Sequence, residues 1–258
     1  MTELVLSNQK VTIEAGELVS FFVDGHEYIH QKGSPGWRSA DAEMFPIIGP
    51  TNEAGFKVTT AKGEAIQDQH GLLRELAYNL VSNTETTAVY EKKYTANTKV
   101  KNSKYPKKST AEDLVWPYSF TFLKTFVLKA NELEVSFKIS GEKGMPFMLG
   151  YHPAFKLHTK APVLLVNEKT VTLNEVLAVG SRALEVPNCT TVTLKDEKEI
   201  TIKSEGFGNF MLWTEVTNMV CIEPVSFYPY GVAQEQLHTG FETLETQEKV
   251  FKVTLQIN

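Results

Sequence analysis

The chain has 258 residues, of which 42% are hydrophobic and 22% are charged, and its formal net charge is -5. These values are close to those of average globular proteins. The negative net charge argues against a nucleic-acid-binding or anionic-membrane-binding surface. Two cysteines, Cys189 and Cys221, are too few for a disulfide framework or a cysteine-based zinc site. We therefore expect a protein of a reducing, cytoplasmic compartment.

Nothing in the sequence predicts targeting to a membrane. The first ten residues, MTELVLSNQK, lack a basic start followed by a long apolar core, so we expect no signal peptide. No stretch reaches the roughly 18 consecutive apolar residues that a membrane helix needs. One basic stretch is rich in Asn, Ser, Tyr and Pro, which is typical of a solvated loop. Its lysines are Lys99, Lys101, Lys104, Lys107 and Lys108.

Alternation of apolar and polar residues is the dominant pattern along the chain, and it predicts β-strands. It is clearest in residues 133–139, LEVSFKI. The β-favouring run at residues 118–128 is separated from this segment by a short polar break, so the two predict a hairpin. Further strands are predicted at residues 4–6, 11–14, 18–23, 56–60, 88–94, 163–166, 190–194, 200–203, 219–222 and 251–257.

Helical patterns are weak by comparison. Residues 40–43 and 72–77 are each predicted to form a turn or two, and no segment has the period of a convincing amphipathic helix. Strands this numerous and short imply an all-β fold, a large antiparallel β-sandwich or barrel. Because there is no internal repeat or low-complexity linker, we expect a single domain over residues 1–258.

The segment from Met145 to Phe155, MPFMLGYHPAF, places a histidine at the end of an apolar strand. Gly150 and Pro153 disfavour regular pairing on either side of His152. An imidazole held there among aromatic residues can transfer a proton in a pocket. The alternative is a hydrogen-bonded structural histidine, and this segment alone does not decide between the two.

A second apolar strand, residues 219–222, is followed at once by Glu223 and Pro224. A carboxylate at the end of a buried strand is costly unless it is paired or functional. Burial would raise its pKa towards the range of a useful general base. Phe227 and the tyrosines after it are expected to form either a pocket wall or an ordinary surface loop.

Two earlier segments carry further candidates. In residues 69–74, QHGLLR, His70 stands beside a glycine and Arg74 follows four residues later. Arginine offers several fixed donors for hydroxyls or carboxylates, although it could equally pair with a neighbouring acid. Trp37 and Arg38 lie in a segment with Gly, Ser and Pro. The indole there is either a packing plug or an apolar face for a sugar ring.

Four short motifs, in this order, resemble those of the aldose 1-epimerase (galactose mutarotase) family. The resemblance is closest to the shorter bacterial branch of galactose mutarotase-related, LacX-like proteins. The motifs are FPIIG at 45–49, HGLLR at 70–74, GYHPAF at 150–155 and CIEP at 221–224. Each is weak alone, but together they span nearly the whole chain. The family fold, a large antiparallel β-sandwich of the galactose mutarotase type, agrees with the period-two pattern.

The resemblance implies a task for each polar candidate in interconverting the α and β anomers of a free aldohexose. His152 matches the general acid that protonates the ring oxygen, and Glu223 matches the general base that takes the proton from the anomeric hydroxyl. His70 matches the histidine that binds and polarises the sugar near the ring oxygen. The expected substrate-binding residues are Arg74, Trp37, Arg38, Phe155 and Phe227.

An acid and a base are sufficient for this chemistry, because they exchange roles when the hemiacetal ring recloses. Each positioned group contributes on the order of 10²–10⁴-fold. We expect a charged His152 and an ionised Glu223 near neutral pH, supported by their mutual attraction. No metal, nucleotide or redox cofactor is required. The expected partner is a small sugar, and the protein is expected to be a monomer or a homodimer.

One position departs from the family pattern, because Pro50 follows FPIIG where family members commonly carry an arginine that helps hold the sugar. This departure leaves a non-catalytic carbohydrate-binding or sensor protein of the same fold as an alternative. A hexose-6-phosphate 1-epimerase is a second alternative, but its cationic phosphate pocket has no arginine cluster near the motifs. A glycoside hydrolase would need a second opposed carboxylate, and a metal-dependent cupin a close His-x-His pair; neither is found.

Overall fold

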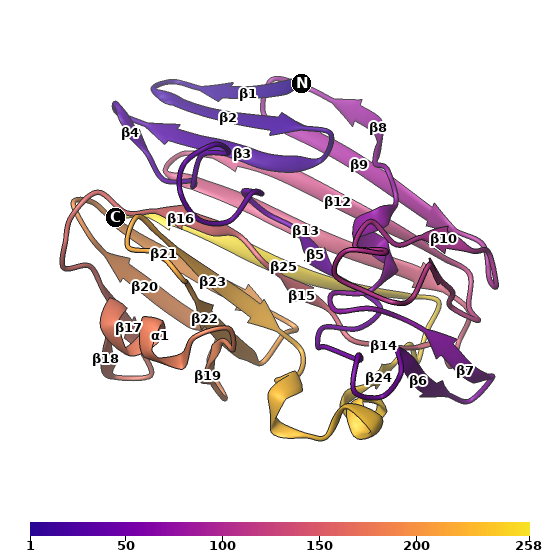
Figure 1. The fold of residues 1–258 in the computed structure, drawn as a ribbon. Coiled ribbons are helices and arrows are strands. Elements are labelled where there is room, and N and C mark those ends of the chain that lie inside the picture. Colours follow the sequence, from indigo (N-terminus) through magenta and orange to yellow (C-terminus); the bar gives the residue numbers. More distant parts are fainter.

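Antiparallel β-sheet is the dominant regular structure of the computed structural model, which describes residues 1–258 (Figure 1). The largest sheet consists of β8 (Asn79–Asn83), β9 (Thr87–Tyr94), β12 (Phe120–Lys129), β13 (Glu132–Gly141), β17 (Val163–Val166), β18 (Lys169–Thr172), β20 (Thr191–Lys195), β21 (Glu199–Glu205) and β25 (Glu248–Ile257). Its order is β18-β17-β20-β21-β25-β13-β12-β9-β8. The all-β class and the large antiparallel sandwich are therefore confirmed.

Two further sheets pack against this large sheet. One consists of β5 (Glu43–Met44), β15 (Gly150–Tyr151), β16 (Ala154–Lys156), β19 (Leu184–Val186), β22 (Asn209–Trp213) and β23 (Met219–Val225). Its order is β19-β22-β23-β15-β5, and β16 also pairs with β23. The other is an N-terminal meander of β1 (Thr2–Leu6), β2 (Gln9–Glu14), β3 (Glu17–Val23) and β4 (His26–Glu27).

Short ribbons and helices cover the ends of the sheets. The ribbons pair β6 (Lys57–Thr60) with β7 (Gly63–Ile66), β10 (Val100–Lys101) with β11 (Asp113–Leu114), and β14 (Pro146–Phe147) with β24 (Glu242–Thr243). The helices are the α-helix α1 (Leu173–Val179) and the 3-10 helices η1 (Leu72–Glu75), η2 (Pro229–Gly231) and η3 (Gln234–Gly240). No helix is both long enough and apolar enough to cross a membrane.

Two local predictions are wrong and one is confirmed. Residues 40–43 form no helical turn, because Ala42 and His152 exchange backbone hydrogen bonds of 2.8 and 3.3 Å that hold the segment extended. The apolar run at residues 44–48 by itself predicts a strand, but β5 ends at Met44 and a cis Phe45–Pro46 peptide bond follows it. The turn predicted at residues 72–77 is present as η1.

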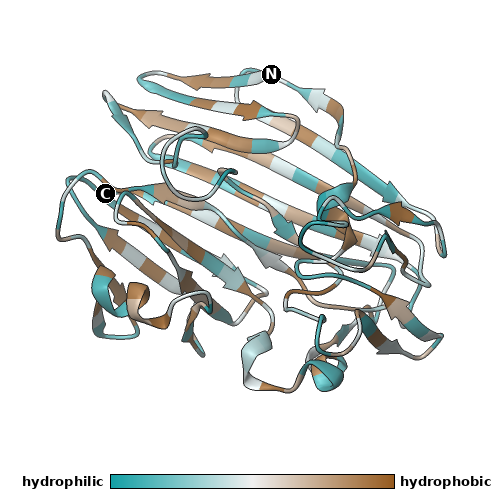
Figure 2. Ribbon diagram, in the orientation of Figure 1, coloured by the Kyte–Doolittle hydropathy of each residue, from teal (hydrophilic) through white to brown (hydrophobic).

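The predicted hairpin, β12 and β13, lies in the interior of the large sheet, between β25 and β9. Buried and partly exposed residues alternate along both β12 and β13, as the sequence pattern requires. Their register places Phe126 opposite Val135 and Phe122 opposite Ile139, so one face of the hairpin is apolar. Figure 2 shows the same alternation of hydrophobic and hydrophilic residues along the other long strands. These faces contribute to one core cluster of 52 buried residues shared by the three main sheets.

Candidate active site

Glu223 lies within β23 and not, as predicted, beyond its end. The strand continues to Val225 because both β22 and β15 pair with it up to that residue. On the β15 side the pairing is interrupted, since β15 ends at Tyr151 and β16 begins at Ala154. His152 therefore occupies a gap in the ladder beside β23, which brings it next to Glu223.

The two side chains form a close pair without a hydrogen bond. His152 Nε2 lies 3.3 Å from Glu223 Oε1, and the side chains are only 7% and 2% exposed. Glu223 Oε1 and His152 Nδ1 are both buried and have no hydrogen-bond partner. Buried polar atoms in folded proteins are almost always hydrogen-bonded, so two unsatisfied atoms in one place call for a functional explanation.

Burial favours the neutral form of both groups. It lowers the pKa of His152 to about 3, and the nearby charge of Arg74 contributes in the same direction. It raises the pKa of Glu223 well above 4.5. The predicted charged pair is therefore wrong, because desolvation outweighs mutual attraction. A neutral imidazole with a carboxylic acid nevertheless holds as many protons as an imidazolium with a carboxylate, so one proton transfer interconverts the two forms.

His70 faces this pair from a strained turn. Its φ is 75°, and a Cβ on the following Gly71 would lie 2.2 Å from the Phe45 carbonyl oxygen, so that position requires glycine. His70 Nδ1 lies 3.0 Å from the carbonyl oxygen of Ile48. A carbonyl only accepts, so Nδ1 carries the proton. Burial lowers the pKa of His70 well below 6.5. The ring is thus neutral, with Nε2 left as an acceptor.

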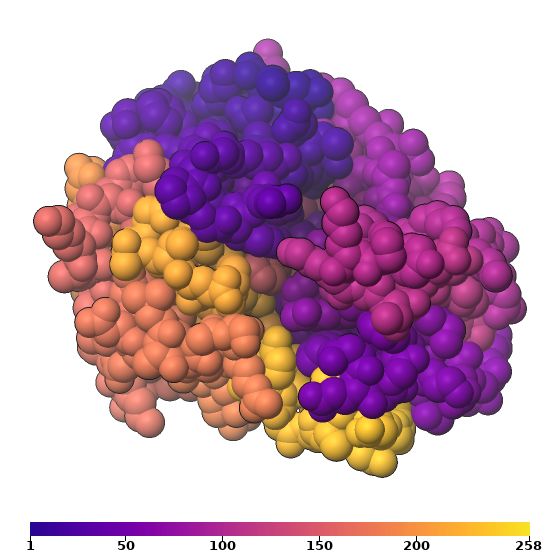
Figure 3. Space-filling model, in the orientation of Figure 1, coloured from indigo at the N-terminus to yellow at the C-terminus, as the bar shows by residue number.

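His70, His152 and Glu223 line one cavity of about 320 Å³. This volume is at the lower end of the range for small-molecule sites. Two indoles enclose His152: the Trp37 ring is tilted by 31° with its centroid 4.1 Å away, and Trp213 meets it edge-on at 5.9 Å. In Figure 3, segments from the N-terminal, middle and C-terminal parts of the chain converge near the centre of the view. The cavity is lined by Trp37, Gln69, His70, Lys108, His152, Ser181, Ala183, Met211, Trp213, Glu223 and Tyr230.

The other predicted binding residues lie outside this cavity. Arg74 lines a neighbouring cavity that shares Trp37, and its Nε lies 3.8 Å from Glu75 Oε1. Arg38 is exposed and lines neither cavity. Phe155 is fully buried in the main core. Phe227 packs on Gly240, where an added Cβ would lie 2.3 Å from its ring. Of the predicted binding residues, only Trp37 lines the cavity with the histidines and Glu223.

The cavity contains residues that the sequence did not single out for it. Lys108 belongs to the basic stretch that we predicted to be only a solvated loop, yet it lines the cavity. In the same stretch, Lys104 Nζ contacts Asp68 Oδ1 at 2.9 Å beside the His70 turn. Trp213 is carried by β22, where the sequence offered only an aromatic residue in an apolar run. The solvated-loop interpretation is therefore incomplete.

Pro50 lines a second adjoining cavity, of about 310 Å³. This cavity shares Gln69, Ser181 and Tyr230 with the first, so the two form connected parts of one cleft. Arg182 also lines it, with its guanidinium 5.9 Å from the centre of the Tyr230 ring. A cation is thus present near Pro50, although it comes from another part of the chain.

His152, Cys221 and Glu223 are also close enough to share a metal ion, since their ligand atoms lie within 4.8 Å of one another. A cysteine binds metals as a thiolate. Burial raises the pKa of Cys221 well above 9.0, and the charge of Glu223 acts in the same direction. The chemistry of this set therefore fits proton transfer better than metal binding. Both cysteines are free and buried.

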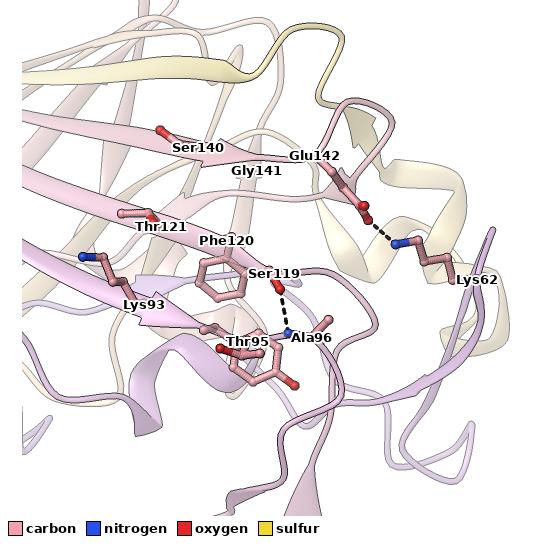
Figure 4. Close-up of a pocket in the computed structure, with 11 residues that line it drawn as sticks. Lys62, Lys93, Thr95, Ala96, Ser119, Phe120, Thr121, Ser140, Gly141 and Glu142 are labelled. Carbon is pink, nitrogen blue, oxygen red and sulfur yellow. Dashed lines mark hydrogen bonds and ion pairs between the residues drawn. The ribbon is translucent and has the colours of Figure 1, made fainter.

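A larger hollow of about 470 Å³ lies elsewhere, along the ends of β9, β12 and β13 (Figure 4). Its lining includes no histidine. Lys62 and Glu142 point towards each other across it and form an ion pair. Ser119 accepts a hydrogen bond of 2.9 Å from the Ala96 backbone. The hollow therefore offers no imidazole for acid–base chemistry.

Comparisons with known proteins point to one family. The model of the aldose 1-epimerase family matches residues 54–210. A galactose mutarotase-related enzyme from Lactobacillus acidophilus superposes with a TM-score of 0.80 at 18% identity, over 100% of this chain and 97% of that one. A galactose mutarotase-like protein from Lactobacillus casei gives 0.80 at 18% identity over 100% of both chains. A galactose mutarotase-like protein from Clostridium acetobutylicum gives 0.70 at 12%, over 99% and 94%. No curated protein matches the chain in sequence.

Proposed function

The chain belongs to the aldose 1-epimerase family, and we propose that it interconverts the α and β anomers of a free aldohexose by acid–base catalysis. The observation that carries this proposal is the buried pair His152–Glu223, whose Nδ1 and Oε1 atoms have no hydrogen-bond partner. The two sugar oxygens that exchange protons are bonded to the same anomeric carbon. An acid and a base only 3.3 Å apart are well placed to serve both.

In the proposed reaction, Glu223 takes the proton of the anomeric hydroxyl while His152 gives one to the ring oxygen. The bond between the ring oxygen and the anomeric carbon breaks, leaving an open-chain aldehyde. Rotation about the adjacent C–C bond presents the other face of the carbonyl. The hydroxyl then attacks it while His152 takes a proton back and Glu223 returns one. The protein ends in its starting protonation state.

The neutral forms of His152 and Glu223 fit this cycle once a sugar is bound. Hydrogen bonds from sugar hydroxyls to the Glu223 carboxylate would stabilise its ionised form and so lower its pKa. The proton then moves to His152 and produces the required acid. His70, which offers an acceptor at Nε2, suits a sugar hydroxyl better than the ring oxygen, which has no proton to donate. The indoles of Trp37 and Trp213 offer apolar faces to the C–H side of a ring.

Polarimetry on freshly dissolved α-glucose and α-galactose tests the proposal. We expect wild type to accelerate anomer exchange, and Glu223→Gln and His152→Ala each to lose about 10²–10⁴-fold in rate. Glu215→Gln, which changes an exposed carboxylate, is the matched control and should retain full activity. If wild type and a Glu223→Gln/His152→Ala double variant exchange the anomers equally slowly across several aldoses, the proposal is refuted. Saturable sugar binding without acceleration would instead identify a non-catalytic sugar-binding protein.

A second candidate substrate class, a hexose 6-phosphate, gains support from the positions of Lys108 and Arg182. Both are exposed, and they line the two connected parts of the cleft. Together they could bind a phosphate at the rim while the sugar reaches His152. If so, Lys108→Ala/Arg182→Ala should raise KM for glucose 6-phosphate at least tenfold and leave KM for glucose unchanged. Equal effects on the two sugars would exclude this class.

A further inference from the structure

A second cluster of ionisable side chains lies at the other end of β16 from His152. Three separate parts of the fold contribute to it: His26 is in β4, His158 follows β16, and Glu197 is in the turn between β20 and β21. One ligand atom from each lies within 4.8 Å of the other two. The cluster shares no residue with the active-site cavity and has no part in the proposed reaction.

The orientation of His158 is fixed by a backbone contact. Its Nε2 lies 2.9 Å from the carbonyl oxygen of Glu27, and a carbonyl only accepts. Nε2 therefore carries the proton, and Nδ1 presents its lone pair to the cluster. Metal-binding histidines commonly hold their second nitrogen in this way, which fixes the tautomer. Nδ1 lies 3.7 Å from Glu197 Oε2, too long for a hydrogen bond. Two ligands of one tetrahedral zinc ion lie roughly 3.3–3.5 Å apart, given bonds of about 2.0–2.2 Å.

The neighbouring Asp196 holds the turn in place. Its Oδ2 accepts a hydrogen bond of 2.5 Å from the backbone of His158, and its Oδ1 accepts one of 3.0 Å from the backbone of Thr159. The turn that carries Glu197 is thereby attached directly to the segment that carries His158. Both carboxylate oxygens of Asp196 are occupied, so its role is to position the other groups.

The two imidazoles lie against each other, with ring centroids 4.1 Å apart. This contact places one nitrogen of each ring within 4.8 Å of the other and of a Glu197 carboxylate oxygen.

We propose that His26, His158 and Glu197 form a binding site for a divalent transition-metal ion of the zinc class. Two imidazoles and one carboxylate are ligands that zinc accepts, whereas calcium and magnesium prefer oxygen alone. Three protein ligands leave a coordination position for water. A bound ion would join the N-terminal meander, the end of β16 and the large sheet. Because the unfolded chain does not assemble this set, the ion stabilises the fold.

Titration of the chelator-treated full-length chain with Zn²⁺ near neutral pH, followed by calorimetry, tests the site. We expect one equivalent to bind and Zn²⁺ to raise the midpoint of thermal unfolding. His26→Ala and His158→Ala should each weaken binding at least tenfold. Glu197→Gln should weaken it by a smaller factor and, being on an exposed turn, should fold normally. Co²⁺ in place of Zn²⁺ should give an absorption spectrum typical of nitrogen and oxygen ligands.

Two variants serve as controls. His238→Ala removes another partly exposed histidine and should bind Zn²⁺ as wild type does. His152→Ala removes the other cluster that could hold an ion and should also leave binding unchanged. Undiminished binding by Glu197→Gln and by a His26→Ala/His158→Ala double variant would overturn the proposal. So would loss of binding in His152→Ala alone. Neither result bears on the mutarotase proposal, because the readout does not involve sugar.

Discussion

Two clusters of buried ionisable groups lie near Trp37, and they differ in how far opposite charges offset the cost of burial. In the first, His152 and Glu223 leave two polar atoms without partners. In the second, which we call the Lys124 cluster, Lys124 Nζ lies 2.7 Å from Asp41 Oδ2 and 2.6 Å from Glu43 Oε1. Trp37 lines both the cavity of His152 and the one that borders Asp41 and Glu43.

This difference shows that burial of an ionisable group does not by itself identify a catalytic residue. Burial opposes charge in both clusters, and it raises the pKa of Asp41 to about 6. For Lys124 and Glu43, however, the opposite charges outweigh burial. The two carboxylates raise the pKa of Lys124 despite its complete burial, and lysine charges lower the pKa of Glu43. The pair at His152 has no such compensation, and both of its members are neutral. Compensated charges therefore stabilise the fold, whereas the neutral pair at His152 has no such structural explanation.

The largest effect on stability should follow from breaking the Lys124 cluster. Lys124→Met leaves two buried carboxylates without their partner, and we expect a loss of about 3–5 kcal/mol in the free energy of unfolding. Denaturant titration measures it. We propose that residues 1–258 form one domain, so the whole transition should shift without a second step. The triple variant Lys124→Met/Asp41→Asn/Glu43→Gln should recover part of the loss, and no recovery would contradict our explanation.

A smaller effect should follow from removing one neutral donor of the same cluster. Tyr151 Oη donates a hydrogen bond of 2.7 Å to Asp41 Oδ2, and the tyrosine is fully buried. Tyr151→Phe should cost about 1.5–3 kcal/mol, as for a hydrogen bond to a charged group. Tyr28→Phe is the control, because no hydrogen bond of its hydroxyl occurs in the structure, and it should change stability by less than about 0.5 kcal/mol. Equal effects of the two changes would argue against a structural role for this bond.

The smallest expected effect is the pH dependence of the unfolding free energy that comes from the pair His152–Glu223. Between pH 4.5 and 6.5 the folded and unfolded pairs bind equally many protons, so the pair adds no pH dependence there. Above pH 6.5 the unfolded His152 loses its proton, and stability falls with rising pH for as long as the folded state retains the Glu223 proton, whose pKa is raised by burial. Below pH 4.5 the unfolded state binds the extra proton on His152, and stability falls as pH falls, down to about pH 3.

Each slope should approach about 1.4 kcal/mol per pH unit. The measurement is the difference in unfolding free energy between wild type and His152→Gln/Glu223→Gln across this pH range. The difference should be largest between pH 4.5 and 6.5. A difference that instead rises steadily through pH 7 would show that the pair is charged in the folded protein.

The strands of the fold could be predicted well because their signal is local. Alternation in residues 133–139 and 251–257 gave both the strand type and the buried face. The missed helix α1 also had a local signal: Thr172 and Glu175 form a capping box, and Gly180 ends the helix. The error at residues 40–43 had a different origin, because the extended form there depends on pairing with His152, which is distant in sequence.

The site could be predicted only in part, because its motifs are local in the sequence whereas its electrostatics are not. His152 and Glu223 could be proposed from motifs, and the structure places them together, whereas their protonation depends on desolvation that no sequence pattern reports. Lys124 occupies a core-facing position of β12, between Phe122 and Phe126. The strand pattern therefore showed a lysine at a position expected to be apolar, but it could not show which carboxylates pair with it. The roles of the site residues, the oligomeric state and the cytoplasmic location stay predictions.

The gap in the ladder beside β23 has a consequence for how the protein could diversify. The spacing between His152 and Glu223 is set by backbone pairing of three strands, not by loops. Much of the cavity rim lies outside the strands, on loops that supply Trp37, Lys108 and Ser181 and on η2, which supplies Tyr230. Under the proposed function, insertions or substitutions in these segments could therefore change which sugar is accepted while His152 and Glu223 keep their separation. Libraries restricted to these segments should alter specificity without changing the distance between the proposed acid and base.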